Sequence, residues 1–183
     1  YNITNDYFVG SADFKEKFDP KENGSIQWCA CFNTYNPAIK SFCNTISTNE
    51  GGTHESGFLN AIAKGFKSYI ELIGDKKFAA INKDDVQEIL SSSISVFVEQ
   101  PQFVGQTKDK LSNVEVQKKV EGTIKDRFEN WLANDKARTL LLIENLRIRA
   151  EERIKNKKKK ETLRKTPLKR LMHPGKLAVC SIA

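Results

Sequence analysis

The 183-residue sequence predicts an α/β fold followed by a long helical arm, and three patterns support this prediction. Apolar residues alternate with other residues in SIQWCACFN (25–33) and SSSISVFVEQ (91–100), as in half-buried strands. Apolar residues recur every three or four positions in residues 55–73 and 113–134, as on one face of a helix. Residues 136–165 keep a helical character and become strongly basic.

Length and composition favour one globular domain with an appendage. Apolar residues make up 39% of the chain, which is ordinary globular usage. No run of about 18 apolar residues occurs, so we expect no membrane partner and a cytoplasmic location. The N-terminal YNITNDYF has no signal-peptide pattern. The first residue is not Met and the sequence stops abruptly at AVCSIA, so we expect a piece of a longer protein.

Four cysteines occur, at Cys29, Cys31, Cys43 and Cys180. Strand alternation places Cys29 and Cys31 on the same face of a strand. A metal site is one interpretation, but no second cysteine or histidine pair supplies the remaining ligands. We therefore favour small buried thiols in a reducing compartment and expect no bound metal.

The net charge of +7 is concentrated in one segment. Residues 151–170 contain ten Lys or Arg and three Asp or Glu, and the remainder of the chain carries twenty of each sign. A neutral body with a basic arm predicts a polyanionic partner, most simply a nucleic acid. A solvated helix or a flexible tail is the alternative.

The N-terminal third of the sequence predicts a β-hairpin. Residues 1–25 are expected to form loops and short extended pieces, with a turn in DPKENG (19–24). The run at 25–33 places Ile26, Trp28, Ala30 and Phe32 on one face. KSFCNTIST (40–48) places Phe42, Asn44, Ile46 and Thr48 on one side and Cys43 and Thr45 on the other. The intervening TYNPAI supplies turn residues, so the two strands are predicted to pair.

The middle of the chain predicts two helices and a strand. A helix over Glu55–Ile73 has Thr53 as its N-cap and Gly74 as its stop. Its apolar stripe consists of Phe58, Ile62, Phe66, Ile70 and Ile73. INKDDVQEIL (81–90) predicts a short helix, and the strand after it presents Ile94, Val96 and Val98 on one face.

After Asn113 the chain is predicted to be helical to about Thr166, with a break in ANDKA (133–137). The first of these helices carries an apolar stripe of Val116, Val120, Ile124, Phe128 and Trp131 or Leu132. A helix over Lys136–Lys165 would be about 45 Å long. Its second half has no apolar stripe to bury, and Pro167 ends it. The predicted organisation is a core over 1–112, a packing helix over 113–134, a basic helix over 135–170 and a linker over 171–183.

The stretch PQFVGQTKDKL (101–111) is the candidate binding loop. It follows a predicted strand, precedes a helix and contains Gly105, Gln106, Thr107 and Lys108 in a row. A lysine ammonium suits a phosphate, and a glutamine amide can donate to another phosphate oxygen. Any exposed loop lysine would give the same pattern, so this feature is weak by itself.

No complete set of catalytic residues is visible in the sequence. Gly51 and Gly52 precede a helix and could hold an anion, but a tight turn is the more common use of such a pair. His54 beside them is interpreted as a capping or packing residue and not as a base. No Walker-type phosphate loop is present.

Three motifs together resemble the B subunits of bacterial type IIA DNA topoisomerases. These are NEGGTHESGF (49–58), SVFVEQPQFVGQTKDKLSNVEV (95–116) and PGKLAVC (174–180). The segment SIQWCACFNTYNPAIKSFCNTI (25–46) lacks a longer insert and is more similar to the B subunit of topoisomerase IV (ParE) than to gyrase B. The resemblance implies a transducer domain between an ATPase domain and a TOPRIM domain. The implied fold has two α/β layers and a left-handed βαβ crossover.

The resemblance also implies roles for the loop. Gln106 and Lys108 would contact the γ-phosphate of ATP bound in the ATPase domain, and Lys108 would stabilise the transferring phosphoryl group. The long helix would relay the nucleotide state to the DNA gate. ATP and Mg would be bound mainly by domains outside this chain, which alone should be inactive. His173 and Val179 depart from the family motif, where Leu and Asp are usual.

Further implied partners are double-stranded DNA and a ParC-type A subunit in a heterotetramer that decatenates or relaxes DNA. The implied DNA-binding residues are Arg153, Lys157, Lys158, Lys159, Lys160, Arg164 and Lys165. Three alternatives stay open: a gyrase B transducer involved in negative supercoiling, a plain basic DNA-binding module, and a structural connector.

Overall fold

The computed structural model describes residues 3–14, 24–74 and 81–165. The predicted linker over 171–183, with His173 and Val179, lies outside the described residues, as does most of the predicted turn at 19–24. The chain divides into two compact units, residues 1–150 and residues 151–183, and each is described by itself. No described helix is both long and apolar enough to cross a membrane.

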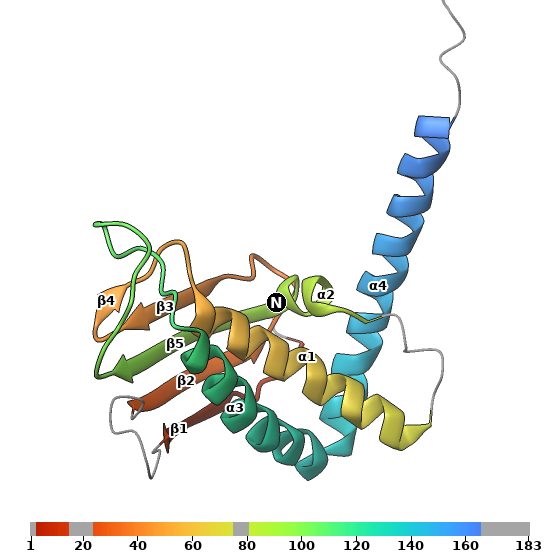
Figure 1. The fold of residues 1–183 in the computed structure, drawn as a ribbon. Helices are drawn as coiled ribbons and strands as arrows, with labels where there is room; N and C mark the ends of the chain where they lie inside the picture. Colours follow the sequence, from red (N-terminus) through yellow and green to blue (C-terminus); the bar gives the residue numbers. More distant parts are fainter. Residues whose placement is uncertain (1–2, 15–23, 75–80, 166–183) are drawn as a thin grey trace, which may run out of the picture. The chain divides into compact units, whose positions relative to one another are not determined.

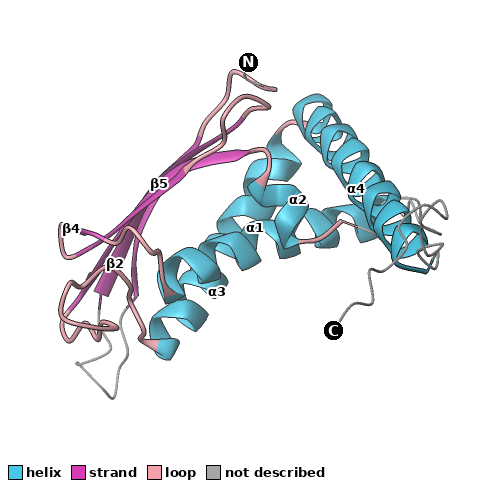
Figure 2. Cartoon of the chain, turned by 90° about the horizontal axis from the view of Figure 1, so that it is seen from above, coloured by secondary structure: helices cyan, strands magenta, loops and turns pink. Residues whose placement is uncertain are grey.

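The first unit is an α/β domain in which helices cover one face of a five-stranded sheet (Figures 1 and 2). The strand order is β1-β2-β5-β3-β4. β2 pairs antiparallel with β1 and with β5, whereas β3 pairs parallel with β5. In chain order the elements are β1 (Phe8–Phe14), β2 (Gly24–Phe32), β3 (Ile39–Cys43), β4 (Ile46–Ser47), α1 (Thr53–Ile73), α2 (Lys83–Gln87), β5 (Leu90–Val98), α3 (Val114–Asn134) and α4 (Lys136–Lys165).

The predicted pairing of the strands at 25–33 and 40–48 is wrong. β5 lies between β2 and β3, and the hairpin partner of β3 is the two-residue β4. β5 pairs along one edge with β2 and along the other with β3, so it lies in the middle of the sheet. The face assignment in β3 also differs, because Ser41 and Cys43 are buried and Phe42 is only half-buried.

The connection from β3 to β5 passes through α1 and α2 and joins two neighbouring parallel strands. Figure 1 shows both strands pointing to the left, with β5 below β3 and α1 in front of the sheet. A chain that leaves β3, passes in front of the sheet and returns below makes a left-handed turn. The left-handed crossover implied by the family resemblance is therefore confirmed, and it departs from the common right-handed rule.

The core lies between the sheet and the layer of α1 and α3. The predicted face of β2, with Ile26, Trp28, Ala30 and Phe32, is buried, and so is the predicted stripe of α3. Leu132 is fully buried at the end of that stripe, whereas Trp131 is half-buried. The Phe128 ring is central, with its centroid 5.0 Å from Phe66 and 5.1 Å from Phe8. These aromatic contacts join both helices to the sheet.

Of the described cysteines, Cys43 matches the prediction of a buried thiol, whereas Cys29 and Cys31 do not. Cys29 is exposed and Cys31 is half-buried, because both lie on the face of β2 opposite the core. Cys43 is buried, and burial raises the pKa of its thiol to about 11. The described residues contain no group of three His, Cys, Asp or Glu that could hold a metal ion.

The ends of the helices follow local chemistry, with one correction. Gly52, and not Thr53, is the N-cap of α1. Gly74 ends α1 in the left-handed conformation, as predicted. Asn82 caps α2 with a reciprocal capping box to Asp85. Asp135 has extended backbone between α3 and α4, so the predicted break is confirmed.

His54 in the first turn of α1 is fully buried, which agrees with its interpretation as a packing residue. Its Nε2 lies 3.3 Å from Thr48 Oγ1, and its Nδ1 has no hydrogen-bond partner. Burial lowers the pKa of the imidazole to about 4. The ring is therefore neutral at physiological pH.

Two helical glycines should respond oppositely to alanine. A Cβ on Gly57 of α1 would lie 2.6 Å from the backbone oxygen of Gln117 in α3, so Gly57→Ala must separate the helices. We expect it to lower the free energy of unfolding by about 1–3 kcal/mol. A Cβ on Gly122 of α3 would meet no atom within 4 Å, so Gly122→Ala should raise it by up to about 1 kcal/mol. Urea denaturation of both variants tests this; equal shifts would contradict it.

Burial of His54 should make stability fall in acid. In the unfolded chain His54 binds a proton below its ordinary pKa of 6.5, whereas the folded chain excludes that proton down to about pH 4. The contribution of His54 to the free energy of unfolding is therefore complete above pH 6.5. It is lost as the pH falls toward 4, by about 3 kcal/mol in all. His54→Gln has no such titration and should lose less stability over this window. Parallel stability curves for the two proteins would contradict this assignment.

Candidate functional site

The loop between β5 and α3 forms a small hairpin that presents the candidate residues at its tip. Its two arms are joined by a bridge between Phe103 and Leu111. The amide of Val104 donates to the carbonyl of Lys110 at 2.9 Å, and the amide of Ser112 donates to the carbonyl of Gln102 at 2.8 Å. The stretch that was predicted only as a loop therefore has an ordered ladder at its base.

The tip of this hairpin contains Gln106, Thr107 and Lys108, and all three are exposed. Gly105 has φ 77° and Lys108 has φ 59°, so both adopt the left-handed conformation. That conformation is ordinary for glycine and strained for a lysine. Strained backbone concentrates at functional positions, which makes Lys108 a stronger candidate than its sequence alone did.

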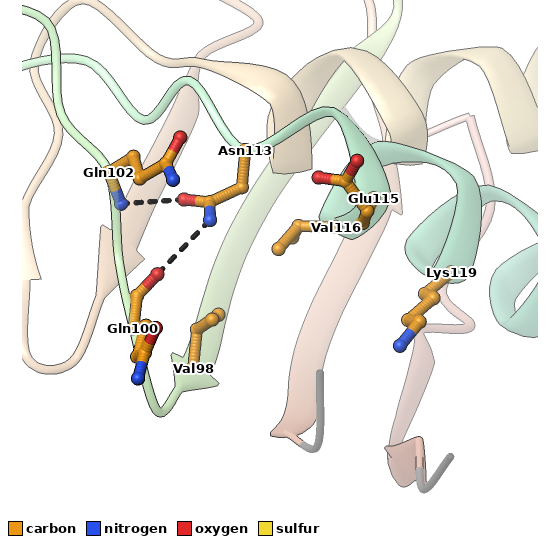
Figure 3. Close-up of a pocket in the computed structure, with 7 residues that line it drawn as sticks. All are labelled: Val98, Gln100, Gln102, Asn113, Glu115, Val116 and Lys119. Atoms are coloured by element: carbon orange, nitrogen blue, oxygen red, sulfur yellow. Dashed lines mark hydrogen bonds between the residues drawn. The ribbon is translucent and has the colours of Figure 1, made fainter. Parts of the chain in front are cut away.

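Asn113 fixes the base of the hairpin from the side of α3 (Figure 3). Its Oδ1 accepts the amide of Gln102 at 2.7 Å, and its Nδ2 donates to the carbonyl of Gln100 at 3.1 Å. Asn113 is the N-cap residue of α3 by position, but its side chain holds the incoming arm and makes no cap hydrogen bond. The side chain thus ties the incoming arm of the hairpin to the start of α3.

The returning arm is also paired with the segment that leads into α1. The Leu111 amide donates to the Gly51 carbonyl at 3.2 Å, and the Thr53 amide donates to the Leu111 carbonyl at 3.0 Å. The Glu50 amide donates to the Asp109 carbonyl at 3.0 Å. A Cβ on Gly52 would lie 2.5 Å from the Leu111 oxygen, so only glycine permits this approach.

These contacts decide between the two interpretations of the glycine pair. Gly51 has φ 68° and Gly52 has φ 147°, as a tight turn requires. The Thr53 amide already donates to Leu111 and is not free for an anion. The pair is a structural turn, and its function is to receive the returning arm of the hairpin.

The second unit begins at residue 151 and contains the basic part of α4. Lys157, Lys158, Lys159 and Lys160 are exposed, and Arg153 is half-buried. Arg164 and Lys165 lie within the helical range of α4. Because α4 is regular over this range, successive lysine side chains point in different directions around its axis.

The chemistry available at the hairpin tip is anion binding. An amide and an ammonium can donate hydrogen bonds to phosphate oxygens, and Lys108 supplies a positive charge. Sequence reasoning found the tip residues but missed Asn113 and the pairing of Leu111 with the glycine turn, which have no local signature.

Comparison with known proteins agrees with this architecture. The family described as DNA gyrase B matches residues 3–162. The B subunit of DNA topoisomerase 4 from Bartonella bacilliformis is 45% identical over 159 residues, which cover 87% of this chain and 23% of that protein. The B subunit of DNA gyrase from Mycoplasma genitalium is 38% identical over 154 residues, which cover 81% of this chain and 23% of that protein.

A solved structure of the topoisomerase IV ATP-binding domain of Francisella tularensis, in complex with a small-molecule inhibitor, has the same fold. It superposes with a TM-score of 0.73 at 29% identity and covers 83% of this chain and 41% of that chain. The chain spans about a quarter of the length of the curated relatives that it matches. By its matched family, its sequence identity and its fold, the chain belongs to the DNA gyrase B family.

Proposed function

We propose that this chain is the transducer segment of a type II DNA topoisomerase B subunit, most similar to topoisomerase IV. The hairpin tip contacts the γ-phosphate of ATP bound in a neighbouring ATPase domain through Gln106 and Lys108. Hydrolysis and phosphate release remove that contact, and the segment relays the change toward the DNA gate. The enzyme as a whole would then pass one duplex through another to decatenate or relax DNA.

One observation carries this proposal: an exposed lysine with left-handed backbone stands at the tip of a hairpin that is fixed on both arms. A loop of this kind is stiff at its base and free at its tip. It can therefore deliver a positive charge to a site outside its own domain. The attachment by Asn113 adds to this support, because it fixes the base from which the tip projects.

The residues of the hairpin tip are suited to bind the terminal phosphate of a nucleotide, and they offer no site for its other parts. Gln106 and Lys108 would hold the terminal phosphate, where Lys108 opposes negative charge as the phosphoryl group leaves. The described residues contain no group of carboxylates for Mg. We propose that Mg and the remainder of ATP are bound by the ATPase domain, so that this chain completes a site it does not contain.

The basic part of α4 is proposed to bind duplex DNA. Lys157, Lys158, Lys159 and Lys160 are exposed, and Arg153, Arg164 and Lys165 extend the same basic segment. Side chains of this type bind the phosphate backbone and do not read base sequence. From the family we also propose a ParC-type A subunit as a partner in a heterotetramer. The proposed location is the cytoplasm. A gyrase B transducer is the alternative within the same family.

Replacing Lys108 tests the contact with the nucleotide. In the full-length protein with its A partner, Lys108→Ala should lower kcat for ATP hydrolysis by about 100-fold or more while ATP still binds, because the lost charge acts on the leaving phosphoryl group. Lys110→Ala is the matched control, since it removes an equal charge from the returning arm of the same hairpin. Equal kcat values for Lys108→Ala and the unmodified enzyme would refute the proposed contact.

Salt dependence tests the contact with DNA. Lys157→Glu with Lys160→Glu should reduce the steepness of log K against log salt by about 2, because each phosphate contact contributes about 0.9 to that slope. Lys67→Glu with Lys118→Glu changes the net charge equally at exposed positions of the first unit. If both pairs change the slope alike, DNA binding depends on overall charge and not on the basic part of α4.

A further inference from the structure

We infer that His54 is a positioning residue for Lys108, acting through a directed chain of hydrogen bonds that fixes the turn on which the hairpin rests. This inference rests on the proposed function of Lys108. His54 does not touch the hairpin tip, and it is neither a base nor a ligand. Its effect passes through Thr48, Ser41 and Glu55 to the backbone of residues 48–53.

The chain of hydrogen bonds crosses from α1 to the sheet and back to α1. His54 Nε2 lies 3.3 Å from Thr48 Oγ1, and Thr48 Oγ1 lies 2.7 Å from Ser41 Oγ. Ser41 Oγ lies 3.2 Å from Glu55 Oε2. His54, Thr48 and Ser41 are all buried, so water does not compete for these groups.

The Glu55 carboxylate at one end of this hydrogen-bond series determines which group donates and which accepts at every step. A carboxylate only accepts, so Ser41 donates its proton to Glu55. Ser41 Oγ also lies 3.1 Å from the Thr48 carbonyl, but a charged acceptor makes the stronger bond. With its own proton used, Ser41 can only accept from Thr48, and Thr48 in turn can only accept from His54. The imidazole therefore carries its proton on Nε2.

This assignment accounts for the unpartnered atom of His54. If the proton is on Nε2, then Nδ1 has only a lone pair, and Nδ1 is the buried nitrogen with no partner. The opposite tautomer would bury an N–H group without an acceptor, which is unfavourable. The geometry thus selects one tautomer and one direction of donation from His54 to Glu55.

The turn held in this way is the surface on which the hairpin rests. Within the turn, the Thr48 amide donates to the Ser41 carbonyl at 2.9 Å, and the Gly51 amide donates to the Thr48 carbonyl at 2.9 Å. The hairpin then attaches through Asp109 and Leu111 to residues 50–53. A Cβ on Gly51 would lie 2.5 Å from Glu55 Oε2, so the same carboxylate lies close against the glycine turn.

The first test measures ATP hydrolysis by the full-length protein with its A partner. His54→Leu removes the donor, and we expect kcat to fall about tenfold with little change in KM, because the tip is displaced and not removed. His54→Gln keeps a donor near the position of Nε2 and should restore most of the rate. In a Lys108→Ala background, His54→Leu should cause no further loss, because it acts through Lys108.

A matched control separates positioning from general destabilisation. Asn82→Ala removes the capping box of α2, which does not contact the hairpin, and it should leave kcat unchanged. A fall in kcat for Asn82→Ala equal to that for His54→Leu would overturn the inference. So would a His54→Gln variant as slow as His54→Leu.

The second test does not depend on the role of Lys108. Hydrogen exchange followed by mass spectrometry on the full-length protein should show faster exchange in residues 103–113 for His54→Leu and for Thr48→Val, with α3 unchanged. Unchanged exchange in 103–113 would overturn the inference whatever the kinetics show. If exchange changes as expected but Lys108→Ala hydrolyses ATP normally, the proposed function fails while the support of the hairpin by His54 stands.

Discussion

The close approach of Leu111 to Gly52 is the constraint on which the rest of the functional site depends. The Leu111 backbone donates to Gly51 and accepts from Thr53, and a Cβ on Gly52 would prevent this pairing. Three things meet at this point: the start of α1, the end of the hairpin and the lead into α3. Because α1 and α3 pack on the same face of the sheet, the packing of the core fixes the position of the hairpin base.

The core can fix the position of the hairpin base because the contacts among α1, α3 and β1 are close and specific. Gly57 and Gly65 of α1 allow α3 to approach until a Cβ on either would meet Gln117 or Phe128. Phe128 in turn contacts Phe8 of β1 and Phe66 of α1. Interiors packed in this way deform little, so the two helices hold the base of the hairpin in a fixed position.

Periodicity predicted the helices and the core faces well, because burial on one side leaves a direct mark on the sequence. The buried face of β2, the stripe of α3 and the range of α4 all follow from it. Strand pairing was wrong at β2 and β3, since no local pattern shows that β5 lies between them. The residue types of the hairpin tip were visible in the sequence, but Asn113 and Leu111 act through partners distant in the chain.

A stiff base with an exposed lysine suits the proposed contact, which would have to form and break with each nucleotide. Ordering a loop on binding would cost conformational entropy at every encounter, and the ladder from Gln102 to Ser112 removes most of that cost in advance. The side chain of Lys108 remains exposed, so only its own rotamers need to be ordered when a phosphate arrives. The proposed contact could then bind the phosphate firmly enough to depend on its presence and still dissociate when the phosphate leaves.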